Sequence, residues 1–140
     1  MRNLSRQSSK RGLQLAVALC SLVPIAAGGA GLLLGPALIP GAGDGRDLDS
    51  HFRYLSGLLL AIGLAYAASV PGIERKRAQF LLLGAIVVVG GIGRLVSLVM
   101  VGPASPVMLG ALVMELVVTP LLTLWQLRVA RQMSGRFLSR

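Results

Sequence analysis

The chain has 140 residues, of which 54% are hydrophobic and 14% are charged, whereas soluble domains carry about a quarter charged residues. Its formal net charge is +9, but the basic residues border apolar runs and aromatic residues make up only 4%. This pattern excludes a nucleic-acid-binding face with base-stacking side chains. We therefore expect an integral protein of the lipid bilayer that binds no nucleic acid.

Four apolar runs cover residues 13–34, 54–70, 78–101 and 107–127. Each is long enough to cross a hydrocarbon core of about 30 Å as a helix, which takes roughly 17 to 25 residues. Their apolarity is continuous, whereas the strands of a membrane barrel alternate. The sequence predicts an all-α fold: one four-helix transmembrane bundle over residues 13–127, between basic tails at 1–12 and 128–140.

The first run follows a basic segment, as the apolar part of a secretion signal does. Signal segments of this kind usually have about 7 to 15 apolar residues. This run is longer, and it contains Pro24 and several glycines, which are frequent in packed membrane helices. We expect the first run to be retained as a helix rather than cleaved.

Lysine and arginine are distributed unevenly among the segments that connect the runs. Only Arg46 and Arg53 lie between the first and second runs, and only Arg94 lies within the third. The other basic residues lie before the first run, between the second and third, and after the fourth: Arg2, Arg6, Lys10, Arg11, Arg75, Lys76, Arg77, Arg128, Arg131, Arg136 and Arg140. Cytoplasmic loops retain positive charge, so we expect both termini in the cytoplasm.

Small residues recur within the runs, often four residues apart, which places them on one face of a helix. In lipid, helices associate through close packing at such residues. The candidate helix-packing positions are Gly31 and Gly35 in the first run, Gly57, Ala61 and Ala65 in the second, and Gly90 in the third.

The segment GPASP at 102–106 is a short turn, so the third and fourth runs should form an antiparallel hairpin. At 1.5 Å per residue, Arg94 and Glu115 lie at matching depths, roughly 10 to 12 Å from the turn end of their runs. An arginine alone in hydrocarbon costs at least about 2.5 kcal/mol. A carboxylate can meet it through two parallel hydrogen bonds. The sequence therefore predicts a buried Arg94–Glu115 ion pair that faces the bundle interior.

Two interpretations of this pair stay open. It could lock the third helix to the fourth, or it could line a polar pocket open to the outer face. Ser97 and Thr119 lie one turn from the pair and could satisfy its remaining lone pairs, while Pro120 would weaken the helix beside Thr119. The candidate polar residues of such a pocket are Ser97, Thr119, Arg53 and Ser56.

The outer loop at 40–50 and the residue after it form a small polar cluster: Asp44, Asp47, Asp49 and His51. The twelfth position of a calcium loop starting at Asp44 would be Leu55 rather than glutamate. We interpret the cluster as a solvated turn in which Asp47 or Asp49 could pair with Arg53. The sequence contains no spaced metal ligands, phosphate-binding loop or nucleophile motif, so it predicts no catalytic residue, no metal and no cofactor.

Over residues 51–131 the chain resembles a bacterial family of small four-helix membrane proteins, catalogued as a domain of unknown function, number four-three-four-five. The resemblance is carried by FRYLSGLLLAIG at 52–63, GRLVS at 93–97, GPASP at 102–106 and MEL at 114–116. It implies a four-span bundle in the bacterial inner membrane and no known chemistry. The family's arginine, serine and glutamate positions fall on Arg94, Ser97 and Glu115, with a further arginine at Arg53.

From these observations we expect a membrane protein without catalysis, a binding or accessory module. Its polar pocket would receive a lipid-like ligand, or its glycine-lined faces would receive a membrane partner subunit. The alternative is a small membrane enzyme or proton-coupled carrier in which Glu115 accepts a proton and Arg94 holds an anion. A pocket that reaches Arg94 would favour ligand binding or chemistry, whereas a fully packed pair would favour a structural role.

Overall fold

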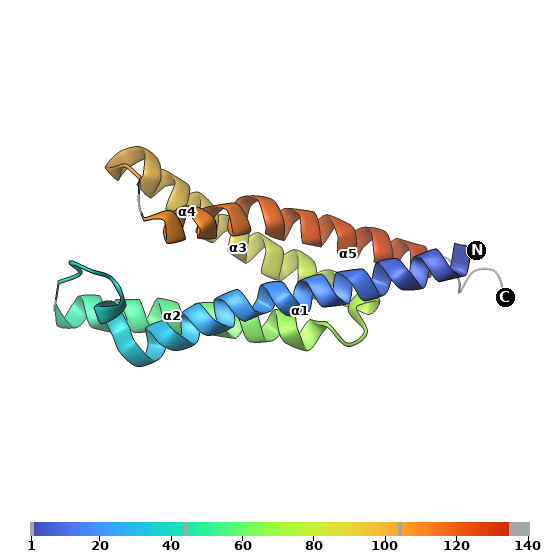
Figure 1. Cartoon of the computed structure of the whole chain (residues 1–140), viewed down its shortest axis with the longest axis horizontal. Coiled ribbons are helices and arrows are strands. Elements are labelled where there is room, and N and C mark those ends of the chain that lie inside the picture. Colours follow the sequence, from blue (N-terminus) through green and yellow to red (C-terminus); the bar gives the residue numbers. More distant parts are fainter. Residues whose placement is uncertain (1, 44, 104, 135–140) are drawn as a thin grey trace. The chain divides into compact units, whose positions relative to one another are not determined.

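The computed structural model describes residues 2–43, 45–103 and 105–134, and this part of the chain is almost entirely helical (Figure 1). The long helices are α1 (Arg2–Leu34), α2 (Arg46–Ser69), α3 (Arg77–Val101), and a fourth that joins α4 (Pro106–Val113), the π-helical segment η3 (Met114–Val118) and α5 (Thr119–Ser134). Two 3-10 turns, η1 (Gly35–Leu38) and η2 (Ile73–Arg75), lie in the connections. The described residues contain no strand, which confirms the predicted all-α fold with four helices.

All four helices are long and apolar enough to cross a membrane. Their limits differ from the predicted runs in three places. The fourth helix continues to Ser134, so the first part of the expected tail at 128–140 is helical. The helix α1 begins at Arg2, so the expected basic tail is helical and continuous with the first run. The helix α2 begins at Arg46, because Asp47 and Asp49 occupy its first turn, where carboxylates interact favourably with the helix dipole. The side of the membrane on which each terminus lies stays a prediction.

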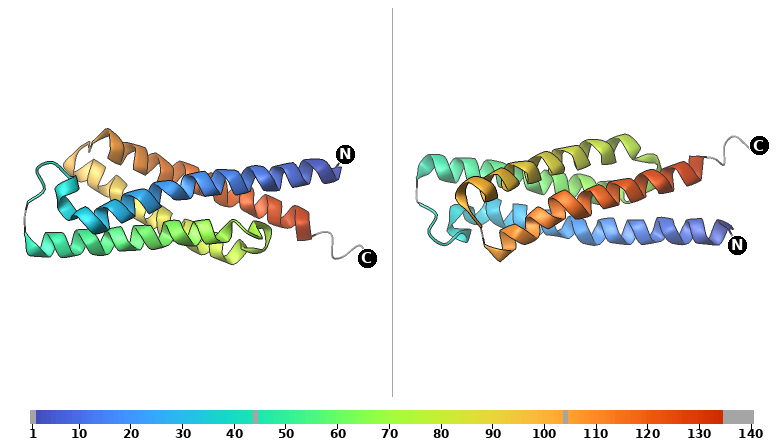
Figure 2. Two further views of the ribbon diagram at one scale, coloured as in Figure 1. Left: turned by 60° about the horizontal axis from the view of Figure 1, so that its bottom comes forward. Right: turned by 90° about the horizontal axis from the view of Figure 1, so that it is seen from above.

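Contacts divide the chain into two compact units. One, here called the α3–α5 unit, consists of Met1–Gln14 and Pro71–Arg140. The other, the α1–α2 unit, consists of Leu15–Val70. Figure 2 shows the helices of each unit from two further directions.

Small residues bring α1 and α2 together in the α1–α2 unit. A Cβ atom at Gly28 would lie only 2.5 Å from the backbone nitrogen of Leu60, and one at Gly63 would lie 2.9 Å from that of Ile25. Such distances leave no room for any side chain. The two backbones therefore touch at glycines, as expected for helices that associate in lipid.

The closest contact of α2 with α1 lies along Ser56 and Gly63, whereas the sequence predicted packing positions at Gly57, Ala61 and Ala65 without assigning them a neighbour. Ser56 is buried and contacts Gly31 of α1, whereas Ala61 is exposed, Ala65 is half-buried and Gly57 has only one side-chain atom within reach, 4.0 Å away. Ser56 and Gly63 are seven residues apart, which is close to two full turns of 3.6 residues. A four-residue rhythm drifts around the helix, so Gly57, Ala61 and Ala65 do not form the seam with α1.

Arg53 of α2 closes the carboxyl end of α1. Its Nη1 donates to the carbonyl oxygens of Leu32 and Leu33, at 2.7 and 3.0 Å. Its Nε donates to Oδ2 of Asp49 at 2.9 Å, so Asp49 is the carboxylate that pairs with Arg53. The last carbonyls of a helix have no partner within the helix, and a cation interacts favourably with them. Gly35, predicted to pack helices, follows α1 with a φ of +65°, and a Cβ atom there would lie 2.7 Å from side-chain atoms of both Arg53 and Asp49 of α2.

The buried side chains of the α3–α5 unit lie at the end where α1 begins. Five of them are no more than 1% exposed: Leu13, Ile73, Phe80, Gln126 and Val129. The Gln126 Nε2 donates to the carbonyl oxygen of Ile73 at 2.8 Å, which satisfies a buried peptide group. This core joins η2 to α3 and α5.

Polar contacts fix the start of α1 to the same end of the unit. The Trp125 Nε1 donates to Oγ of Ser9 at 3.1 Å, and Nζ of Lys10 lies 3.0 Å from Oε2 of Glu74. These contacts bring together the three basic segments that flank the helices. Arg136 and Arg140 lie outside the described residues.

Two adjacent glycines test the contact between α1 and α2. We expect Gly28→Ala to lower the free energy of unfolding by about 1 to 3 kcal/mol, because its Cβ would meet backbone atoms that cannot give way. A Cβ atom at Gly29 would meet nothing within 4 Å, so Gly29→Ala should raise stability by roughly 0.5 to 1 kcal/mol through helix propensity. Thermal unfolding in detergent, followed by circular dichroism, measures both. Equal effects would contradict the proposed contact.

The Lys10–Glu74 pair makes the start of α1 sensitive to acid. Burial raises the pKa of Glu74, but hydrogen bonds from its own backbone amide and from Lys10, with nearby positive charge, outweigh burial and lower it. The stabilisation is therefore complete above the ordinary glutamate pKa and is lost as the pH falls through the lowered value. Trp125, the only tryptophan, reports this loss by fluorescence. The variant Glu74→Gln should show a smaller change between neutral pH and about pH 3.

Candidate functional site

The turn between α3 and the fourth helix is made by glycine and proline. Gly102 follows α3 with a φ of +109°, a conformation that favours glycine. Pro106 begins α4, where its missing N–H removes no helical hydrogen bond. The two helices therefore run antiparallel, and residues equally far from the turn come to equal depth (Figure 1).

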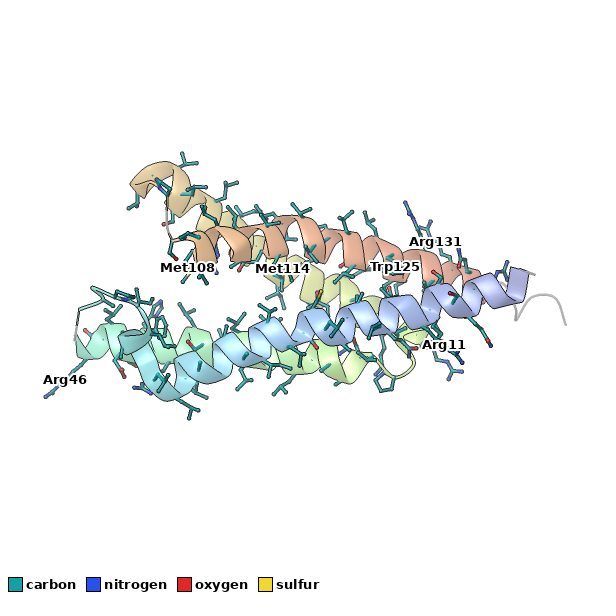
Figure 3. All side chains as sticks on the ribbon, viewed as in Figure 1. Arg11, Arg46, Met108, Met114, Trp125 and Arg131 are labelled. Atoms are coloured by element: carbon teal, nitrogen blue, oxygen red, sulfur yellow. The ribbon has the colours of Figure 1, made fainter. Side chains whose placement is uncertain are left out.

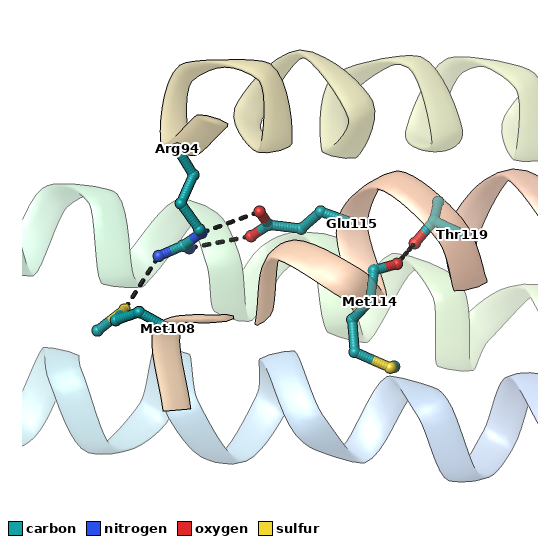
Figure 4. A network of polar contacts seen from close by, with 5 residues as sticks. All are labelled: Arg94, Met108, Met114, Glu115 and Thr119. Atoms are coloured by element: carbon teal, nitrogen blue, oxygen red, sulfur yellow. Dashed lines mark hydrogen bonds and ion pairs between the residues drawn. The ribbon is translucent and has the colours of Figure 1, made fainter. Parts of the chain in front are cut away.

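Arg94 of α3 and Glu115 of η3 form a two-point ion pair (Figure 4). The Nε of Arg94 donates to Oε2 of Glu115 and Nη2 donates to Oε1, both at 2.9 Å. The side chains are 33% and 17% exposed within the chain, so the pair is half-buried rather than buried as the sequence predicted. Two antiparallel helices cover only the surfaces that face each other, which leaves one side of the pair open.

A glycine one turn before Arg94 lets Glu115 reach this position. A Cβ atom at Gly91 would lie 2.7 Å from Cδ2 of Leu116 and 2.9 Å from Cβ of Glu115. The close approach of α3 and η3 thus occurs at Gly91. The predicted packing glycine, Gly90, has nothing within 4 Å on its side of the helix, because adjacent residues of a helix point in directions about 100° apart.

The helix that carries Glu115 is wider than an α-helix over Met114–Val118. Pro120 follows this segment, and it has no N–H to donate to the preceding turn. The backbone N–H of Thr119 donates to the carbonyl oxygen of Met114, and Oγ1 of Thr119 donates to the same oxygen at 2.9 Å (Figure 4). The Thr119 hydroxyl therefore stabilises the π-helical turn and does not bind Glu115 as expected. Such turns often occur at functional sites.

Arg94 has a second partner residue that sequence reasoning missed. Its Nη1 donates to Sδ of Met108, on the first turns of α4, at 3.0 Å (Figure 4). A thioether is a weak acceptor and is usually assigned to packing, so its residue type gives little signal. The reach of an arginine side chain along its helix is the feature that could have suggested a contact nearer the turn.

A hollow of about 190 Å³ opens beside the guanidinium of Arg94. Its walls come from α3 and α4: Arg94, Ser97, Leu98, Met108, Leu109 and Leu112. Ser97 is exposed and lines this hollow; in the described part of the chain it makes no hydrogen bond to the ion pair. Of the five N–H donors of a guanidinium, the bonds to Glu115 and Met108 use three. The hollow thus combines free donors with apolar walls.

The other predicted pocket residues belong to the α1–α2 unit. Arg53 caps α1, and Ser56 packs against Gly31, so each has a structural role there. His51 is exposed, with its ring centroid 6.5 Å from that of Tyr54. Asp44 lies outside the described residues. Across residues 2–43, 45–103 and 105–134, no three His, Cys, Asp or Glu side chains are grouped to hold a metal ion.

Comparison with known proteins identifies one matching family. A family model described as "Domain of unknown function (DUF4345)" matches residues 12–126. The match includes the ion pair and every residue that lines the hollow. No curated protein and no solved structure matches the chain.

A double-mutant cycle measures the coupling between Arg94 and Glu115. We expect Arg94→Ala and Glu115→Ala each to lower the free energy of unfolding by up to about 3 to 5 kcal/mol, because each leaves a charge unpaired. The double variant should lose less than the sum of the two, since it leaves no unpaired charge. Thermal unfolding and folded yield in detergent give the three values. A double variant that loses the full sum of the two single losses would show that the pair contributes no coupling.

Proposed function

The chain belongs to the family described as Domain of unknown function (DUF4345), and we propose that it is a binding module that holds the headgroup of a lipid-like molecule beside Arg94. We further propose that it resides in the bacterial inner membrane with both termini in the cytoplasm. The four membrane-length helices and the basic segments grouped at one end of the α3–α5 unit support this orientation.

The observation that carries the proposal is a guanidinium with spare donors at the wall of an otherwise apolar hollow. Glu115 neutralises the charge of Arg94, so the site favours a neutral acceptor, such as an ester carbonyl or hydroxyl, over a multiply charged anion. The exposed hydroxyl of Ser97 offers a second polar contact. Leu98, Leu109 and Leu112 supply surface for the start of an alkyl chain.

The size of the hollow limits what it can hold. Sites that enclose a drug-sized molecule usually measure about 300 to 1,000 Å³, whereas this one measures about 190 Å³. It therefore suits one polar headgroup, while the remainder of the molecule lies along the exposed apolar residues of the hairpin. An amphiphile of the bilayer, with one polar headgroup joined to an alkyl chain, fits this arrangement.

The geometry of Glu115 favours binding over the enzyme or carrier alternative. Both of its carboxylate oxygens accept hydrogen bonds from Arg94. A general base needs an oxygen directed at the proton that it removes. The tight pair also occupies the part of Arg94 that would clamp an anionic substrate in two-point fashion.

Filling the hollow tests the proposal. We expect Leu112→Phe to reduce by tenfold or more the amount of lipid-like molecule that copurifies with the protein from its native membrane, because the larger ring occupies the headgroup position. Mass spectrometry of organic extracts from equal amounts of wild-type and variant protein measures this amount. The thermal unfolding midpoint of each sample checks that the variant is folded.

Leu124→Phe is the matched control. Leu124 is 52% exposed on α5 and does not line the hollow, so the same substitution there should leave the copurified molecule unchanged. An unliganded wild-type protein, or equal loss in both variants, would contradict binding at the hollow.

A further inference from the structure

We propose that the end of the α3–α5 unit at which α1 begins is a binding site for anionic phospholipids. Three segments far apart in the sequence contribute its cations: Arg6, Lys10, Arg11, Arg75, Lys76, Arg77, Arg128 and Arg131. In the described part of this unit, the acidic residues are Glu74, at the same end, and Glu115, which pairs with Arg94. This inference is independent of ligand binding at Arg94.

The positive charge of this end is available to a partner. Glu74 pairs with Lys10, which is half-buried. The other seven cations are exposed, and none of them has an ion pair within the described residues. A cluster of like charges destabilises itself unless counter-charges surround it. The site therefore requires several anionic groups rather than one.

The fold holds these cations in fixed relative positions. The contacts Ser9–Trp125 and Lys10–Glu74 attach α1, and the bond from Gln126 to Ile73 attaches η2 to α5. Each of these contact residues either belongs to the basic set or lies within three positions of one of its members in the sequence. Figure 3 shows Arg11, Trp125 and Arg131 at this one end, with both arginine side chains directed away from the helices. The cations are thus displayed on a packed scaffold rather than on separate tails.

The position of the cations along the helices identifies the partner. They lie where α1 and α3 begin and where α5 ends, at the borders of membrane-length apolar segments. A phosphodiester of the bilayer lies at that level, and arginine binds phosphate oxygens through two parallel hydrogen bonds. The half-buried indole of Trp125 is the type of side chain enriched at this boundary. Basic clusters of this size next to membrane helices attract anionic lipids.

Titration of the purified full-length protein in a mild detergent tests the site. Phosphatidylglycerol and cardiolipin are added separately, phosphatidylcholine serves as the zwitterionic control, and native mass spectrometry and Trp125 fluorescence follow binding. We expect both anionic lipids to bind, cardiolipin more tightly because it carries two phosphodiesters, and both to bind less tightly as salt increases. Equal affinity for phosphatidylcholine and phosphatidylglycerol would overturn the proposal.

Single-charge variants locate the site. Lys76→Gln and Arg77→Gln, which alter exposed residues without ion pairs, should each weaken phosphatidylglycerol binding roughly fivefold. Arg46→Gln removes one exposed charge from the α1–α2 unit and should have no such effect. Equal weakening by Arg46→Gln would show that net charge alone attracts the lipid. Full competition by inorganic phosphate at matched phosphate concentration would show a general anion site instead.

Discussion

A guanidinium within an apolar helix must find its hydrogen-bond partners inside the protein, and this requirement determines how α3 meets the fourth helix. Arg94 can reach both oxygens of Glu115 only where the two helices come close, and Gly91 is the position that permits this approach. The short turn at Gly102 sets both residues at the same depth. The same geometry produces the hollow. The guanidinium donates hydrogen bonds to Glu115 and Met108, and it still lines the open side of the hairpin.

Properties that depend on distance along a helix could be predicted from the sequence. The four helices follow from the lengths of the apolar runs, since a membrane of given thickness requires a given number of residues. The partner of Arg94 follows from the fixed rise per residue on either side of a short turn. The sequence left Asp47 and Asp49 as candidate partners of Arg53, and the four-residue spacing on α2 selects Asp49 in the structure. None of these inferences needs to know which way a helix is rotated.

Properties that depend on rotation about a helix axis could not be predicted in the same way. The adjacent glycines of α3 offer more than one possible contact face, and the sequence does not decide between them. In the structure the contact lies at Gly91, whereas the predicted position was Gly90. The π-helical turn before Pro120 changes the rotation again, and it draws the Thr119 hydroxyl to a backbone carbonyl. The degree of burial of Arg94 depends on how many helices surround it. The spacing of residues along one helix does not indicate that number.

In the α3–α5 unit, the fully buried side chains and the hollow beside Arg94 lie at different ends of the helices. Its fully buried residues, including Phe80 and Gln126, lie at the end that carries the exposed cations. The hairpin at the other end of α3 has no fully buried side chain among its described residues, and its helix is widened at Met114–Val118. Low packing density makes local rearrangement less costly than global unfolding. A rearrangement of the hairpin beside Arg94 can therefore leave the contacts of Trp125 and Glu74 intact.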